Sequence, residues 1–270
     1  MTEMQGGPEE PMNENLTDTV EPAAAVEAAG AATDEHIVVP EAPQEAASEI
    51  QADGEEPISF GFSQRVVVLS DSASAEAEAI AALRTHLLAH HIRAGRRGLA
   101  VCAPSSSSGA TFVAVNLAVS LARAGIRTLL IDANLRKPAV HRFIVPSEEM
   151  PSLKDCLSDN SVAFGNVIQE EVIPSLSIIY SGGQSTNAQE LLAAPPFKSL
   201  VDLCMRDFEV TIVDTPASNN NSDARRIASI VRHCLIVARK DVTYVSDVKT
   251  LIDEMKSDKV NVIGTVLNEF

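Results

Sequence analysis

Short apolar runs alternate with amphipathic segments over the C-terminal three quarters of the sequence. Continuous apolar runs predict strands that are buried on both faces, and they lie at residues 99–103, 127–132, 176–180, 210–214, 233–238 and 260–267. Apolar residues at helical spacing predict helices near residues 74–94, 112–125, 153–157, 188–194, 196–206, 222–231 and 246–257. This alternation predicts an α/β fold with a doubly wound, mainly parallel sheet. The run Val66–Leu69 predicts a short strand or an extended lead-in.

The first part of the chain lacks any such pattern. Residues 1–57 are rich in Glu, Ala, Pro and Gly and contain no Phe, Trp or Tyr. A segment of this composition buries too little apolar surface to offset the entropy lost on ordering. We therefore predict an acidic, disordered tail at residues 1–57 and one folded domain at residues 58–270.

The charge of the chain is concentrated in that tail. Fifteen of the 37 acidic residues lie within residues 1–60, which contain no Lys or Arg, and the remaining residues carry 22 acidic and 21 basic side chains. A nearly neutral domain gives no electrostatic reason to expect binding to nucleic acid or to an anionic membrane surface. We therefore expect neither, and a membrane would be reached only through a partner.

Cysteine spacing and hydropathy indicate the compartment. The four cysteines have no C-x-x-C spacing, and they predict buried thiols in a reducing environment; they are Cys102, Cys156, Cys204 and Cys234. No apolar run reaches the roughly 18 residues that span a bilayer, and the N-terminus has no basic segment followed by an apolar core. We expect a cytoplasmic protein.

A phosphate-binding loop is predicted between the strand at residues 99–103 and the following helix. Such a loop places backbone N–H groups at a helix N-terminus, where the helix dipole favours anions. Its usual pattern is G-x-x-x-x-G-K-[ST], with lysine on the outer phosphates and the hydroxyl on magnesium. Here Gly109 and Thr111 match, but Ala110 occupies the lysine position. The candidate nucleotide-binding residues are Ser108, Gly109, Ala110, Thr111 and Phe112; ordinary turn and N-cap chemistry is the alternative.

Two predicted strands end in an acid at the same edge of the sheet. Asp132 and Asp214 would join Thr111 there, because ligands of such sheets bind beyond the carboxyl ends of the strands. Two carboxylates and a hydroxyl suit Mg²⁺, which prefers oxygen ligands and retains several waters. Asp214 would hold the metal through water, and Asp132 would orient or deprotonate the attacking hydroxyl as the catalytic residue. Each acid alone also suits a helix cap or turn.

Several short motifs resemble those of the bacterial tyrosine kinases. They lie at residues 116–118, 129–138, 187–192, 213–216, 222–224 and 266–268. More narrowly, they are similar to the cytoplasmic ATPase domain of the polysaccharide co-polymerase system, which governs the chain length and export of capsule and exopolysaccharide. The resemblance covers roughly residues 66–270, and the Leu-Arg-Lys-Pro element after Asp132 is among its most specific parts.

The resemblance implies a P-loop fold of the deviant Walker type, as in partitioning and cell-division ATPases, that binds ATP or ADP with Mg²⁺. It puts Asp132 in a kinase-specific acidic motif, Asp214 in the Walker B role and Asn268 near the base. It also implies a homo-oligomer that assembles through Glu78 and Arg84, although Ala81 replaces the middle arginine of that motif. The implied partner is a membrane polysaccharide co-polymerase.

Departures from the family pattern change the expected activity. Ala110 replaces the P-loop lysine, Asn134 replaces the second acid of the kinase motif, and the sequence stops without a tyrosine-rich tail, with Tyr180 and Tyr244 its only tyrosines. We expect a degenerate, weak or inactive kinase that regulates polysaccharide polymerisation or export with the co-polymerase. A positioning ATPase of the wider family and a docking scaffold that binds no nucleotide remain as alternatives.

Overall fold

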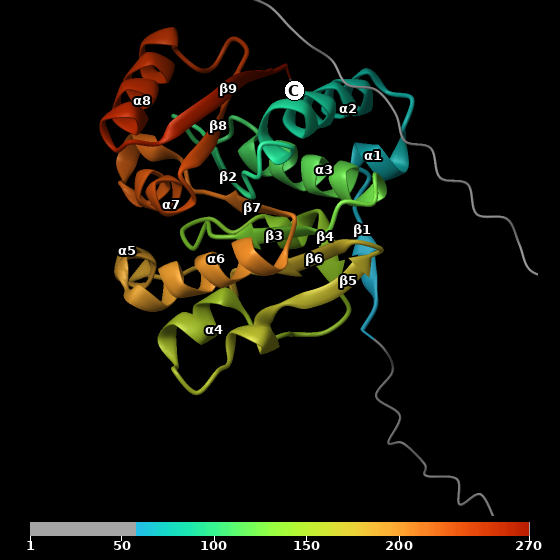
Figure 1. Ribbon diagram of the computed structural model, residues 1–270, viewed down its shortest axis with the longest axis vertical. Helices are drawn as coiled ribbons and strands as arrows, with labels where there is room; N and C mark the ends of the chain where they lie inside the picture. Colours follow the sequence, from blue (N-terminus) through green and yellow to red (C-terminus); the bar gives the residue numbers. More distant parts are fainter. Residues whose placement is uncertain (1–57, 270) are drawn as a thin grey trace, which may run out of the picture. The chain divides into compact units, whose positions relative to one another are not determined.

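A single seven-stranded sheet organises the protein (Figure 1). The computed structural model describes residues 58–269, so the predicted acidic tail lies outside the described residues. The strand order is β5-β6-β3-β7-β2-β8-β9, and all neighbours are parallel except β5 and β6. The strands are β2 (Gly98–Cys102), β3 (Thr128–Asp132), β5 (Gln169–Ile173), β6 (Leu176–Ile179), β7 (Val210–Asp214), β8 (His233–Arg239) and β9 (Asn261–Asn268). The predicted doubly wound, mainly parallel sheet is confirmed.

Helices cover both faces of this sheet (Figure 1). One face packs against α1 (Val67–Ser70), α2 (Ala75–Leu87) and α3 (Ala110–Arg123). The other packs against α4 (Leu153–Ser158), α5 (Ala188–Ala193), α6 (Pro195–Asp207), α7 (Asp223–Val231) and α8 (Val245–Ser257). Along β2 the side chains alternate, with Leu99 and Val101 on the α3 side and Ala100 and Cys102 on the other. Because both faces are covered, the sequences of the inner strands such as β2, β3 and β7 are nearly all apolar.

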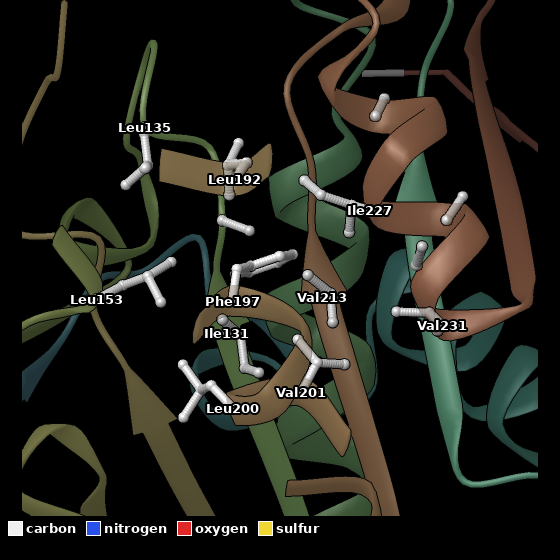
Figure 2. Close-up of a cluster of buried hydrophobic side chains, with 14 of the residues drawn as sticks. Ile131, Leu135, Leu153, Leu192, Phe197, Leu200, Val201, Val213, Ile227 and Val231 are labelled. Carbon is white, nitrogen blue, oxygen red and sulfur yellow. The ribbon is translucent and has the colours of Figure 1, made fainter. Parts of the chain in front are cut away.

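The core on the second face is built around α6 (Figure 2). Phe197, Leu200 and Val201 of this helix are fully buried and belong to one cluster with Ile131 of β3 and Val213 of β7. Figure 2 shows these side chains gathered between α6 and the two strands. This packing fixes the positions of β3 and β7, whose last residues are Asp132 and Asp214.

The register brings the chemically important strand ends together. Asp132 is the register partner of Asp214, and Arg239 is the partner of Asn268. Because these strands are parallel, their carboxyl ends and the loop after β2 lie at the same edge of the sheet.

The largest difference from the sequence prediction concerns Val66–Leu69. This run was expected to be extended, but residues 67–70 form the short helix α1. Val66 and Val68 are buried in the cluster around α3, and Asn116 of α3 bonds to the backbone on both sides of the turn. Packing and these hydrogen bonds therefore override the strand preference of β-branched residues.

Other elements differ in extent. The helix predicted at residues 74–94 begins at Ala75 with Ser74 as its N-cap, ends at Leu87 and continues as a π-helix over Leu88–Ile92. Three strands escaped prediction: β1 (Phe60–Phe62) and β4 (Ile144–Pro146), which pair antiparallel, and the polar edge strand β5. Short 3₁₀ turns lie at Val140–Arg142, Phe164–Val167 and Ser218–Asn220.

The expected burial of the thiols is confirmed, since all four cysteines are buried. Among the helices formed by residues 58–269, none combines the length and the apolarity that a membrane span requires.

We predict that Asn116→Ala destabilises the fold by about 1–3 kcal/mol. The Asn116 side chain is fully buried, donates to the carbonyls of Arg65 and Phe112, and accepts from the N–H of Val68. Its removal leaves these groups without their partner. Urea unfolding measures the effect, with the exposed Asn160→Ala as a control expected to change stability by less than about 0.5 kcal/mol. Equal effects of the two substitutions would contradict this structural role.

Candidate functional site: a phosphate-binding loop between paired carboxylates

The loop between β2 and α3 has the backbone geometry of a phosphate-binding loop. Gly109, the N-cap of α3, has φ +87°, a left-handed conformation that favours glycine. A Cβ atom at this position would also collide with the side-chain amide of Asn268. The glycine is therefore required both for the turn and for the close approach of β9.

Two strand ends and one serine fix the shape of this loop. Asn268 Nδ2 donates to the carbonyl of Ser108 at 3.0 Å, and Arg239 Nη1 donates to the carbonyl of Ser107 at 3.2 Å. Within the loop, Ser108 Oγ donates to the carbonyl of Ser105 at 2.7 Å. The structure thus brings Asn268 to the loop, whereas its place near the base of a nucleotide stays a prediction. It also adds Arg239, which sequence reasoning missed.

Thr111 and Asp214 form the centre of the predicted metal site. Thr111 Oγ1 donates to Asp214 Oδ2 at 2.7 Å. Asp214 is completely buried, and its Oδ1 atom has no hydrogen-bond partner among residues 58–269. An unpartnered buried carboxylate oxygen is costly. A hydroxyl and a carboxylate in this arrangement suit a Mg²⁺ ion held directly by Thr111 and through water by Asp214.

Asp132 has a different environment from the one expected. Its Oδ1 accepts from the N–H of Asn134 at 3.2 Å, and its Oδ2 accepts from those of Ala139 and Val140 at 3.2 and 3.1 Å. The side chain is fully buried and does not line the pocket beside the loop. In this structure Asp132 holds the segment that follows β3, and its roles as metal ligand and catalytic residue stay predictions.

Burial changes the acidity of both carboxyls. It raises the pKa of Asp132 from 3.8 to about 6, against the opposing effect of its three backbone donors. The pKa of Asp214 is raised well above 3.8, mainly because the carboxyl is buried and further because Asp132 lies beside it. Two adjacent buried carboxyls resist being charged together. A cation bound here would relieve that repulsion.

A pocket of about 430 Å³ lies against the phosphate-binding loop. It is lined by residues 105–112, by part of the segment after β3 and by residues 215–217. Among the described residues, no Asp or Glu lines this pocket. Four basic residues do: Arg65, Arg136, Lys137 and Arg142. A concave, basic site at a helix N-terminus is suited to an anion such as a nucleotide phosphate.

The basic residues of the pocket are held differently. Arg136 Nε pairs with the buried Asp223 at 2.6 Å, and Arg65 stacks over the ring of Phe143 at 4.6 Å from its centroid. Arg136 and Lys137 belong to the Leu-Arg-Lys-Pro element after Asp132, whereas sequence reasoning missed Arg65 and Arg142. No motif marks these two, since Arg65 reaches the pocket only through the packing of the segment before α1.

Ala110 and Phe112 line the pocket together with Gly109 and Thr111. Ala110 is the first residue of α3, so the position of the usual P-loop lysine faces the ligand space without supplying a cation. Thus residues 108–112, which are predicted to bind nucleotide, line one pocket. Position 110, where the sequence lacks the P-loop lysine, faces this pocket without a cation.

The predicted oligomerisation residues lie elsewhere. Glu78 and Arg84 belong to α2 and do not line the pocket. Arg84 Nη1 donates to the Ser120 hydroxyl at 3.1 Å and to its carbonyl at 3.3 Å, so it joins α2 to α3 within one chain. Glu78 is exposed. Their role in assembly stays a prediction.

We predict that Asp214→Asn stabilises the metal-free protein, and more so at pH 8 than at pH 4.5. A carboxyl whose pKa is higher in the folded state makes that state bind more protons, so stability falls as pH rises from about 4 through the folded pKa. The amide removes this loss, and calorimetric unfolding should show a gain of about 2 °C or more at pH 8. Asp253→Asn, on the exposed face of α8, is the control. A gain independent of pH would refute this explanation.

Comparison with known families agrees with this geometry. A sequence model of the CobQ/CobB/MinD/ParA nucleotide binding domain matches residues 99–270. The chain is 27% identical over 187 residues to CapB of Staphylococcus aureus, which carries the name of a tyrosine-protein kinase, and the match covers 69% of this chain and 81% of CapB. It is 31% identical over 191 residues to the similarly named EpsB of Ralstonia solanacearum, covering 71% of this chain. The match spans only 25% of EpsB.

Solved structures extend the similarity to three dimensions. The kinase domain of the Escherichia coli tyrosine kinase ETK superposes with a TM-score of 0.67 at 28% identity, over 75% of this chain and 79% of that domain. The resemblance to bacterial tyrosine kinases that the motifs indicated is confirmed. The chain belongs to the CobQ/CobB/MinD/ParA nucleotide-binding domain family and, within it, is a homologue of the kinase domains of bacterial tyrosine kinases.

Proposed function

We propose that this chain is a nucleotide-dependent regulator of capsule or exopolysaccharide assembly that binds ATP or ADP with Mg²⁺ and transfers phosphate weakly or not at all. One observation carries the proposal: the Thr111–Asp214 pair is in place beside a phosphate-binding loop that has Ala110 instead of a lysine. In our proposal this pair and the loop bind the nucleotide and its metal, whereas position 110 lacks the cation that acts during phosphoryl transfer.

We expect the missing cation to lower the rate of phosphoryl transfer more than the affinity for nucleotide. A positioned positive group stabilises charge that develops in the transition state, and removing one such group commonly lowers the rate by ~10²-fold or more. Ground-state binding depends on the sum of many contacts, including the basic pocket lining and the helix N-terminus. A protein that keeps these contacts can act as a switch whose oligomeric state or partner affinity depends on the bound nucleotide.

The polysaccharide assignment is supported by the sequence motifs and by the tyrosine-kinase homologues. We propose that the partner is a membrane polysaccharide co-polymerase at the inner face of the plasma membrane, and that the chain itself remains in the cytoplasm. Homo-oligomerisation through α2 is part of the same proposal. Glu78 is exposed there, whereas Arg84 would have to leave Ser120 to reach a second subunit.

A docking scaffold that binds no nucleotide is the second candidate. The hydrogen bonds of Asp132 favour it, because they give this acid a purely structural reason to be present. The two functions differ in one measurable respect, which is whether the native chain binds nucleotide.

We predict micromolar binding of Mg-ATP or Mg-ADP to the full chain in calorimetric titration. Asp214→Ala should abolish it, because the variant loses the hydrogen-bond partner of Thr111 and the water-mediated metal contact. Asp253→Ala, on α8, is the matched control and should bind like the native chain. If the native chain binds neither nucleotide and Ala110→Lys restores binding, the site has decayed and the scaffold function replaces our proposal.

We also predict that Ala110→Lys raises the rate of ATP hydrolysis by about 10²-fold. The substitution restores a cation at the first residue of α3, facing the pocket. Steady-state release of phosphate measures the change, with Ala110→Met as a control for side-chain length without charge. A native chain that already hydrolyses ATP as fast as the lysine variant would show that the P-loop is not degenerate.

A further inference from the structure

Nucleotide phosphates need more positive charge than the loop provides. A nucleoside triphosphate carries several negative charges, and Mg²⁺ balances only part of them. Ala110 supplies no positive charge, and Arg239, which helps to hold the loop, donates to the backbone carbonyl of Ser107. The rest of the pocket must supply the missing charge if the nucleotide is to bind.

The segment after β3 contributes two suitable side chains to the lining of the pocket. Lys137 and Arg142 are exposed and line the same pocket as Ser106–Thr111. Within residues 58–269 neither forms an ion pair with an acid, and so their charges remain available to a ligand. Arg136, between them in sequence, is engaged with Asp223.

The segment that carries these two cations is fixed at both ends. Asp132 binds the N–H groups of Asn134, Ala139 and Val140, and Asn134 Oδ1 accepts from the N–H of Lys137 at 3.0 Å. We refer to residues 134–142 as the cationic segment. A backbone fixed in advance lowers the entropy lost when its side chains bind a ligand.

Its far end is anchored by the small antiparallel sheet. The N–H of Arg142 donates to the carbonyl of Ala139 at 3.0 Å, and the next residue, Phe143, is buried. The carbonyl of Phe143 accepts from the N–H of Ser63 at 2.8 Å, directly beside the pairing of β1 with β4. The cationic segment is therefore a built part of the pocket wall.

We propose that Lys137 and Arg142 supply the positive charge of the missing P-loop lysine by binding the γ-phosphate. The site therefore prefers a nucleoside triphosphate, which has this group, over a diphosphate, which lacks it. This inference rests on the proposed nucleotide binding and names the residues that determine its specificity. Because these cations come from the segment after β3, they bind the phosphate of the bound nucleotide without occupying the lysine position at the start of α3. The site then discriminates nucleotides while it transfers phosphate slowly.

The test is calorimetric titration of the full chain with Mg-ATP and Mg-ADP. Lys137→Ala and Arg142→Ala should each weaken ATP binding by about tenfold, the usual effect of losing one charge-assisted hydrogen bond, and ADP binding by less than about threefold. Lys249→Ala and Arg93→Ala remove exposed charges outside the pocket and should leave both affinities unchanged. Thermal unfolding of each variant checks that the fold is retained.

A double-mutant cycle tests the exchange of roles directly. In the Ala110→Lys background, the effect of Lys137→Ala on ATP affinity should shrink to less than about threefold, because both cations serve the same phosphate. Fully additive effects would overturn the inference. An unchanged preference for ATP in both alanine variants would also overturn the inference. If Asp214→Ala nevertheless abolishes binding, the proposed function stands. Absence of binding by the native chain would overturn both.

Discussion

The burial of two neighbouring carboxyls at one sheet edge is the constraint on which the rest of the site depends. The parallel register makes Asp132 and Asp214 direct partners, and both are completely buried. Each needs hydrogen-bond donors, because an unsatisfied buried carboxylate is costly. Asp132 obtains them from the segment after β3 and Asp214 from Thr111 at the start of α3. The need to satisfy these two acids thus fixes both walls of the pocket.

The phosphate-binding loop keeps its shape without a lysine because other residues hold it. The carbonyls of Ser107 and Ser108 are bonded to Arg239 and Asn268, from the two strands on the far side of β2. In this protein, loop geometry and loop charge are separate properties. Strands β8 and β9 hold the loop geometry, and in our proposal Lys137 and Arg142 of the cationic segment supply the positive charge.

The sequence was sufficient to predict the parallel strands, the helices between them and the grouping of Thr111 with Asp214. These features follow from apolar runs and from the rule that ligands bind at the carboxyl edge of such sheets. Strand β5 escaped prediction because it is polar, and β1 and β4 did so because three residues are too few to show an apolar pattern. The helix α1 did so because its shape depends on Asn116, about fifty positions away.

The electrostatic details of the site were also beyond sequence reasoning. No spacing rule relates Arg65 or Arg142 to residues 105–112, and the contact between Arg136 and Asp223 joins positions 87 apart. Asp132 was correctly placed at a strand end, but its orientation toward the backbone of Ala139 and Val140 depends on how the following segment turns. Packing decides these features, and pattern alone does not contain them.

The contact between Asn268 and Ser108 links positions 160 apart, and β9 follows the other six strands of the sheet in sequence, so it is synthesised after them. Until β9 pairs with β8, the loop lacks the hydrogen bond from Asn268 and is held from this side by Arg239. The pocket is therefore completed only after the whole sheet has been synthesised and assembled. A partly made chain, or one from which β9 has detached, cannot present the same loop, so occupancy by nucleotide would also report that folding is complete.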